Sequence, residues 1–354
     1  MDYKGALMKG LKEIPSSSLK MNHSQPTCKI NPNWLNLPPD LMVLIMQRVD
    51  WYDVLMNVKE VCKYWHKLSK QPSVWRVIEF KKDILVPKLR RKTGIRTNYE
   101  ELLDEYFRAF TLSRTCMDMP SYLDCREVED NFKRNVDKAL HKMVMHAIDL
   151  SSGQLHHLCL RDFGSDDLIQ HIYQRSSHLR RLRLEYCHVF SDKYVHDFKI
   201  SEKGLIQMLK NLPLLEELEC PYTWIPLECI EVAGRCCPHL RSFISNQRVY
   251  RFTGYPESDA LALAIAKNMP RLRHLQLFGN RMTVTGLKAI LKNCQHLEYL
   301  DLRQCYNLGT KALKKADLET KLCQQIKHVR FPQDSTEDYE FDDAIYDSDG
   351  TYDL

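Results

Sequence analysis

The residues of this chain that most often carry chemistry are its 13 cysteines and 14 histidines. No two cysteines form a CxxC pair, and no cysteine–histidine group has the spacing of zinc ligands. The sequence also lacks a P-loop and the GxGxxG, GxSxG and HExxH motifs. His156 and His157 are adjacent, but they fall within a short strand pattern, which is weak support for a catalytic pair. We therefore expect a non-catalytic protein with no metal and no cofactor.

Composition indicates where such a chain works. No segment approaches the roughly 18 apolar residues of a membrane span, and the first 20 residues lack the apolar core of a secretory signal. We expect a cytoplasmic and/or nuclear protein whose cysteines are free thiols. Residues 334–354 hold nine acids and no Lys or Arg, which leaves a net charge of +14 on the preceding chain. That charge is too diffuse to indicate nucleic-acid binding.

An internal repeat supplies the elements that would position a site. The pattern L-x-x-L-x-L, with two weaker copies, starts at Leu155, Leu179, Leu215, Leu240, Leu272 and Leu297. Three of the intervals are 24 or 25 residues, which is the period of a leucine-rich repeat. Each copy alternates like a short strand with one buried face, and a stretch with helical periodicity follows it. Neither element buries its apolar side alone, so the units are expected to stack into a parallel solenoid.

Four cysteines recur in register with these repeats. Cys187 and Cys305 follow the last leucine of a strand by three residues, and Cys237 and Cys294 precede the next repeat by three. A buried free cysteine behaves as a small apolar residue with a weak donor, which suits a repeated tight corner. The pattern over about residues 150–315, with Cys-Cys-Pro at 236–238, is similar to the cysteine-containing repeats of F-box proteins.

Residues 34–75 predict a separate module of three short helices. Pro38 and Pro39 suit a first helical turn and Asp40 its positive end, and Asp53 is the expected cap of a second helix over Asp53–Val58. Apolar stripes are predicted on the first helix at Leu41, Leu44, Ile45 and Val49, and on a third helix, Lys59–Ser69, at Val61, Cys62, Trp65 and Leu68. About forty residues rarely form a core alone. The pattern fits either docking onto a partner or a cap on the solenoid.

The motifs L-P-x-D, V-C-x-x-W-x-x-L and P-x-x-W in this module resemble an F-box, with Asp40 where Glu is more usual. In that family the module clasps the Skp-type adaptor of cullin–RING ubiquitin ligases. The resemblance implies adaptor contacts by Leu37, Pro38, Leu41, Leu44, Ile45, Val61, Cys62 and Trp65, and packing of Trp75 at the junction with the next domain. Together with the repeats and the acidic tail, it is most similar to the plant F-box/leucine-rich-repeat family. That implies a substrate-recognition subunit of an SCF-type ligase; the alternative is a repeat scaffold without a ligase.

The predicted fold class is α/β, with an N-terminal three-helix F-box-like module followed by a leucine-rich-repeat solenoid that has a parallel concave sheet and outer helices. The expected divisions are a disordered segment (1–30), the F-box-like module (31–80), a basic, partly helical linker (81–137), the solenoid (138–332) and an acidic disordered tail (333–354). Within them we expect a helix over 99–110 and a first solenoid helix over Leu140–Ile148. The basic cluster 88–92 could serve nuclear import or be merely solvated.

The substrate is expected on the concave face of the sheet. The strand leucines point into the core, so the residues between and after them point outward, in rows about 4.8 Å apart. Their mixed charges and aromatic rings suit a protein or peptide better than a polyanion. The candidate contacts are Arg161, Arg181, Arg183, Glu217, Glu219, His274, Phe278, Tyr299 and Arg303. The alternative site is the loop around Tyr250–Tyr255.

Overall fold

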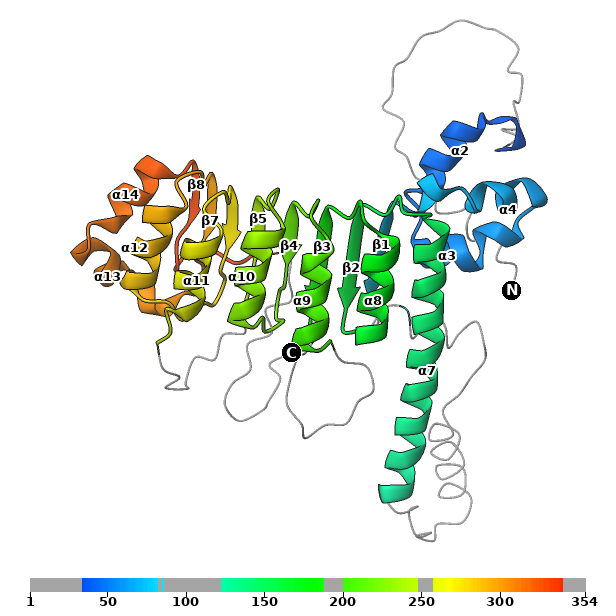
Figure 1. The fold of residues 1–354 in the computed structure, drawn as a ribbon, viewed down its shortest axis with the longest axis horizontal. Helices are drawn as coiled ribbons and strands as arrows, with labels where there is room; N and C mark the ends of the chain where they lie inside the picture. Colours follow the sequence, from blue (N-terminus) through cyan, green and yellow to red (C-terminus); the bar gives the residue numbers. More distant parts are fainter. Residues whose placement is uncertain (1–33, 82–84, 86–121, 188–199, 248–256, 340–354) are drawn as a thin grey trace, which may run out of the picture. The chain divides into compact units, whose positions relative to one another are not determined.

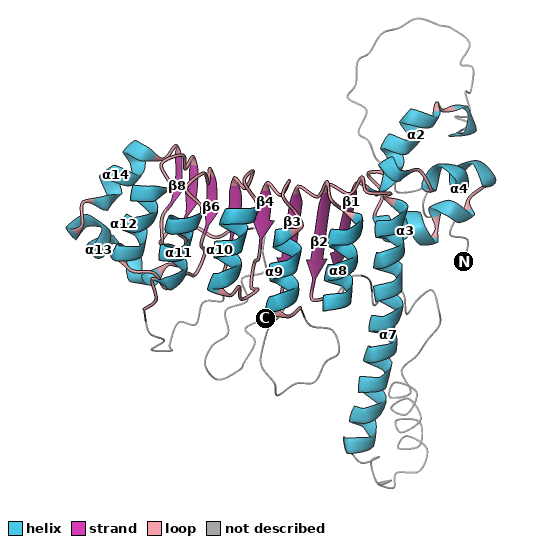
Figure 2. Cartoon of the chain, viewed as in Figure 1, coloured by secondary structure: helices cyan, strands magenta, loops and turns pink. Residues whose placement is uncertain are grey.

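The computed structural model describes residues 34–81, 85, 122–187, 200–247 and 257–339, and the chain divides into two compact units, residues 1–74 and 75–354. Within the described ranges, the larger unit holds one sheet of eight parallel strands whose spatial order follows the chain. Helices α8–α12 line up along one side of this sheet (Figures 1 and 2). This arrangement confirms the predicted α/β solenoid with a parallel sheet and outer helices.

The strand register follows the apolar positions of the repeat. One continuous row aligns Leu158, Leu182, Leu218, Phe243, Leu275, Leu300 and Val329. The first six of these side chains are at most 1% exposed, so a slip of one residue would bring them to the solvent side. The strands are β1 (Val77–Lys81), β2 (His157–Arg161), β3 (Arg181–Glu185), β4 (Glu217–Glu219), β5 (Ser242–Ile244), β6 (His274–Gln276), β7 (Tyr299–Asp301) and β8 (His328–Arg330).

Three helices of this unit, α8, α9 and α12, begin at side-chain caps and bury one apolar face. Ser165, Ser201 and Thr283 each accept a hydrogen bond from a backbone N–H of the first turn, which satisfies a donor that the helix leaves open. The helices are α7 (Tyr122–Leu150), α8 (Asp166–Arg175), α9 (Glu202–Lys210), α10 (Leu227–Cys236), α11 (Ala260–Asn268), α12 (Val284–Asn293), α13 (Thr310–Lys315) and α14 (Leu318–Gln325), with a 3-10 turn, η4 (Tyr306–Leu308). None of the described helices has the length and apolar character needed to cross a bilayer.

The start of the solenoid differs from the expectation. Strand β1 lies in the stretch assigned to the front module, yet it pairs with β2 and fully buries Ile78 and Phe80. The first solenoid helix, α7, begins at Tyr122 rather than at Leu140, inside the expected linker. The predicted helix over 99–110 and the basic cluster 88–92 lie outside the described residues.

The four in-register cysteines occupy the expected corners. Each is buried, and each thiol donates to a backbone carbonyl of the preceding repeat. The Sγ–O distances are 3.3 Å from Cys187 to Leu160, 3.6 Å from Cys237 to Leu209, 3.6 Å from Cys294 to Met269 and 3.0 Å from Cys305 to Leu277. The thiols therefore join successive repeats.

Burial should make these thiols unreactive. It raises the pKa of Cys187 and Cys237 to about 12 and that of Cys294 to about 11, so the thiolate is scarce at pH 8. Iodoacetamide at pH 8 is expected to modify the exposed Cys323 and to spare these three until the chain unfolds, as read by mass spectrometry of peptides. Because a raised folded pKa favours the neutral thiol, the urea midpoint should fall as pH rises above about 8.5. Equal labelling of all four cysteines in the native chain would contradict corner packing.

Within its described residues, from 34 onward, the front unit has three short α-helices and several 3-10 turns. These are η1 (Trp34–Asn36), α2 (Pro39–Met46), α3 (Trp51–Met56), η2 (Val58–Glu60), α4 (Lys63–Ser69) and η3 (Pro72–Trp75). Its core comes mainly from Met42, Val43 and Met46 of α2, from Trp51, Tyr52, Val54 and Leu55 of α3, and from Val58 and Leu68. Helix α2 thus has two apolar sides: Met42, Val43 and Met46 are buried, while the predicted stripe residues Leu41 and Leu44 face solvent.

Two local predictions in this unit were wrong. Asp50, not Asp53, caps α3, since its carboxylate accepts a hydrogen bond from the Tyr52 N–H at 2.9 Å, and Asp53 instead accepts one from the Asn57 amide at 2.8 Å. The helix expected over Lys59–Ser69 is divided into η2 and α4. Cys62 separates them and caps α4, because its Sγ accepts a hydrogen bond from the Trp65 N–H at 3.5 Å.

Candidate protein-interaction surfaces

The front unit exposes apolar side chains at the predicted adaptor positions. Leu41, Leu44 and Val61 are 45%, 49% and 41% exposed, which is unusual for such large apolar side chains. Pro38 is also exposed, and the remaining four candidates, Leu37, Ile45, Cys62 and Trp65, are half-buried. All eight predicted residues are therefore accessible to a partner, whereas Trp75 is buried.

Hydrogen bonds hold the Leu-Pro turn in place beside the helices. The Leu37 N–H donates to the Trp34 carbonyl at 3.4 Å, and the Tyr64 hydroxyl of α4 donates to the Leu37 carbonyl at 3.3 Å. The Pro38 carbonyl accepts the bond that starts α2, from Met42 N–H at 3.1 Å. The structure thus brings the turn, α2 and α4 together, so the apolar side of α2 is presented on a fixed frame.

Charges on the concave face of the sheet are paired across neighbouring strands. Arg181 lies 2.9 Å from Glu217, Arg183 contacts Glu219, and Arg161 on β2 lies 3.3 Å from Glu185 on β3. The first two pairs stand opposite each other in the register of β3 and β4, where unlike charges stabilise a sheet. The predicted basic and acidic rows therefore neutralise each other, which argues against a polyanion as the ligand.

A groove of about 560 Å³ lies on this face. Five of the nine predicted substrate residues line it: Glu217, Glu219, His274, Tyr299 and Arg303. The rings of His274 and Tyr299 stack with their centroids 4.4 Å apart, which forms a rigid aromatic wall. Such a mixture of acidic and aromatic walls suits a peptide or a protein loop.

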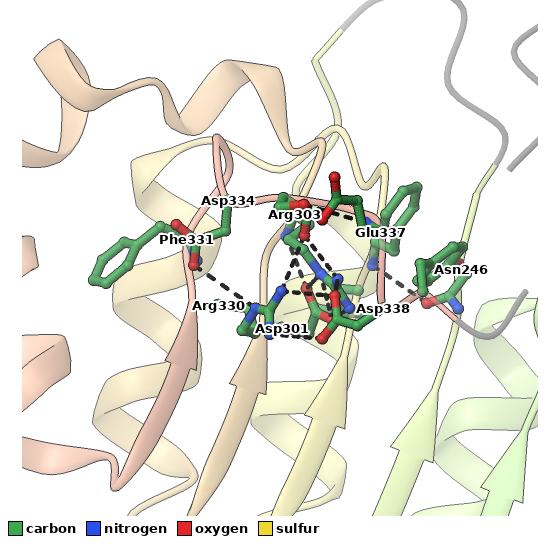
Figure 3. Close-up of polar contacts among 12 residues, drawn as sticks. Asn246, Asp301, Arg303, Arg330, Phe331, Asp334, Glu337 and Asp338 are labelled. Atoms are coloured by element: carbon green, nitrogen blue, oxygen red, sulfur yellow. Dashed lines mark hydrogen bonds and ion pairs between the residues drawn. The ribbon is translucent and has the colours of Figure 1, made fainter.

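The segment that follows β8 covers part of the concave face. From Phe331 it runs across the ends of β7 and β6 toward Asn246, near the end of β5 (Figure 3). Two predicted anchors lie beneath or beside it: Phe278 is 2% exposed and Arg303 is 4% exposed. The expectation that both side chains are open to solvent was wrong, because this segment contacts them.

Three residues that the sequence did not single out lie in this segment or contact it. Asp338 and Tyr339 fall in the predicted disordered tail, yet they bind Arg303 and Phe278, and Tyr222 was assigned no role. The sequence signal that could have indicated this contact is the opposite charge of the acidic tail and of the basic chain that precedes it. The alternative substrate loop, Tyr250–Tyr255, lies outside the described residues.

The concave face holds a cysteine and a histidine whose pKa values are shifted by burial. Among the residues that the structure describes, no group of three or more His, Cys, Asp or Glu side chains is placed to hold a metal ion. Desolvation raises the pKa of the concave-face thiol of Cys159 to about 12, which suppresses the nucleophilic thiolate. Burial also lowers the pKa of His157, so this imidazole is neutral near pH 7.

Two family models match parts of this chain. Residues 34–81 match the F-box-like family and residues 269–291 match a leucine-rich repeat. F-box protein SKIP19 of Arabidopsis thaliana is 34% identical over 306 residues, which are 86% of this chain and 79% of that protein. F-box/LRR-repeat proteins 22 and 23 of the same plant are each 33% identical, over 90% and 92% of this chain and 82% and 59% of their own lengths. The chain belongs to the F-box/leucine-rich-repeat family, and it is similar to members of this family from a plant.

Proposed function

We propose that this chain is the substrate-recognition subunit of an SCF-type, cullin–RING ubiquitin ligase. In this role the front unit binds a Skp-type adaptor and the repeats bind a protein substrate. The observation that carries the proposal is the exposure of Leu41, Leu44 and Val61 within the matched F-box-like segment, at positions where the resemblance implies adaptor contacts. The chain itself performs no chemistry, and the transfer of ubiquitin belongs to other subunits.

The exposed leucines favour an adaptor over a scaffold without a ligase. Removing a leucine side chain from water stabilises a complex by roughly 1.5–3 kcal/mol, so leucines kept at the surface of α2 are available for binding energy. A module that served only to cap the solenoid would gain nothing from them. The rigid Leu-Pro turn lowers the entropy that an adaptor would otherwise lose in ordering this segment.

The repeats supply the second half of the proposal. Their sheet is fixed by a continuous buried row of apolar residues, so its outer positions form a rigid platform for recognition. The groove beside Glu217, Glu219 and Tyr299 has room for several side chains of a bound protein segment. Support for a protein ligand comes from the paired charges and the stacked rings.

Co-expression with a Skp-type adaptor tests the adaptor half directly. The full chain and the adaptor are expected to elute together from a size-exclusion column, with the 1:1 mass confirmed by light scattering. The adaptor alone provides the reference elution volume. Separate elution of the two proteins at micromolar concentrations would support the scaffold alternative.

A further inference from the structure

The segment Ser335–Tyr339 lies on the concave face as a bound peptide would. The Asp338 carboxylate accepts hydrogen bonds from Arg303 Nη1 at 2.7 Å and from both terminal nitrogens of Arg330 at 2.8 Å. The same two arginines also donate to the Ser335 carbonyl, at 3.1 and 3.0 Å. Two guanidinium groups thus bind one carboxylate and one backbone carbonyl of the segment through charge-assisted hydrogen bonds.

Tyr339 enters an aromatic setting next to that fork. Its ring stacks on Phe278 at a centroid distance of 4.0 Å, and the Arg303 guanidinium lies 5.4 Å from the ring centroid. The Tyr222 hydroxyl donates to the Tyr339 hydroxyl at 3.3 Å, and the Tyr222 ring stacks on Tyr186 at 4.9 Å. Residues from several repeats therefore converge on one tyrosine.

Tyr186 and Tyr222 lie at a left-handed corner of the backbone that recurs along the repeats. Tyr186 and Tyr222 have φ values of 52° and 55°, in the left-handed region that bulky residues rarely adopt. By the strand register, Asp162, Gly279 and Gln304 take the equivalent position in other repeats, with φ 53°, 69° and 62°. The left-handed conformation is therefore a corner that the repeats share. At Tyr186 and Tyr222 this corner places two stacked rings along the edge of the concave face.

The floor of the site is built without the segment. Arg303 binds Asp301 through Nε at 3.1 and 3.2 Å and through Nη2 at 2.7 Å, and Asp301 is fully buried. Of the Arg303 hydrogen bonds, those made by Nη1 go to the segment. Asp338 has a side chain that is 58% exposed. The segment therefore lies on a preformed surface rather than within the core.

We infer that Phe278, Arg303, Arg330 and Tyr222 form a recognition site for an acidic residue followed by an aromatic one in a protein partner. The chain's own Asp338–Tyr339 pair fills this site in the free protein and shows which chemistry fits. The adjoining groove, which Asp338 and Tyr339 help to line, takes further residues of the partner. That the partner is a ligase substrate rests on the proposed function; the site does not depend on the adaptor.

A tethered segment competes with a free ligand at an effective concentration in the millimolar range. The test therefore uses the full-length variant Asp338→Ala/Tyr339→Ala, which vacates the site, and a fluorescein-labelled peptide with the sequence of residues 333–339, QDSTEDY. Fluorescence anisotropy should show binding to the vacated variant at least about tenfold tighter than to the wild type. Glu337→Ala, at an exposed residue of the same segment, is the matched control and should behave as the wild type.

Two further changes define the specificity. A peptide with Asn in place of the aspartate before the tyrosine, or with Ala in place of the tyrosine, should bind the vacated variant at least about tenfold more weakly. Adding the Arg330→Ala substitution to the vacated variant should weaken binding of the unchanged peptide to a similar extent, and Arg330 lies at the surface. Binding of QDSTEDY equally to wild type and vacated variant, binding to neither, or binding that ignores these changes would overturn the site. Co-elution with a Skp-type adaptor is measured on the same preparations and reports separately on the proposed function.

Discussion

Replacing Leu41 and Leu44 by aspartate is expected to weaken binding of a Skp-type adaptor at least about 100-fold while leaving the chain folded. Both side chains are nearly half exposed in the free chain, so they contribute little to its core. In a complex they would be buried as anchors, and truncating such an anchor commonly costs about 2 kcal/mol or more. Aspartate adds the cost of placing a charge in an apolar contact. Surface plasmon resonance on an immobilised adaptor measures the change.

The repeats offer a matched control for this variant. Leu227 on α10 and Leu263 on α11 are 43% and 45% exposed, so Leu227→Asp/Leu263→Asp makes the same chemical change at similar exposure. This control pair is expected to bind the adaptor as the wild type does. Both variants should keep the far-UV circular dichroism and the unfolding midpoint of the parent. Full adaptor binding by the α2 variant, or an equal loss in the control, would be evidence against the proposed adaptor surface.

The repeat fold could be predicted because the leucines that recur in the sequence are the same residues that form the buried core. Residues such as Leu158 and Leu182 recur at fixed positions, and the same spacing that identifies the repeat fixes which face is buried. Strand β1 was missed because Val77–Lys81 carries no leucine and directly follows the helical module. Nothing local in those five residues distinguishes a first repeat strand from the end of the module; pairing with β2 decides it.

The front unit shows where periodicity alone is ambiguous. Helix α2 is almost entirely apolar, so its sequence permits burial of the Met42 side or of the Leu41 side. The choice depends on α4, because Tyr64 fixes the Leu37 turn and thereby the rotation of the helix. Only the tertiary contacts therefore show which side is available to a partner.

The concave face was predicted in outline but not in its pairings. Alternation along each strand places Arg183 and Glu219 on this face, yet 36 residues separate them, and only the register shows that they pair. The tail was predicted to be disordered on composition, since strongly acidic segments seldom fold alone. Composition cannot show that Arg303 and Arg330 lie close enough to hold Asp338 between them. In each case the sequence lacked the distances between residues that are far apart along the chain.

Asp301→Ala is expected to destabilise the solenoid by about 3–5 kcal/mol, because it leaves a buried guanidinium without its main partner. Asp301 and Arg303 are 0% and 4% exposed, and the Asp301 carboxylate accepts bonds from the Arg303 side chain and, at 2.9 Å, from its backbone N–H. Asp338, which is largely exposed, cannot compensate for a lost buried carboxylate. Urea unfolding followed by circular dichroism measures the loss.

Two variants separate the buried charge from the loss of side-chain volume. Asp338→Ala removes the exposed partner of the same arginine and should lower the urea midpoint far less, because solvent screens that pair. Asp301→Leu/Arg303→Met removes both buried charges and should recover most of the stability lost in Asp301→Ala, since apolar residues of similar size can replace a buried ion pair. If the double variant were as unstable as Asp301→Ala, the loss would come from packing and not from an unpaired charge. Recovery would show instead that the buried ion pair is dispensable for stability and that the loss in Asp301→Ala comes from the unpaired charge.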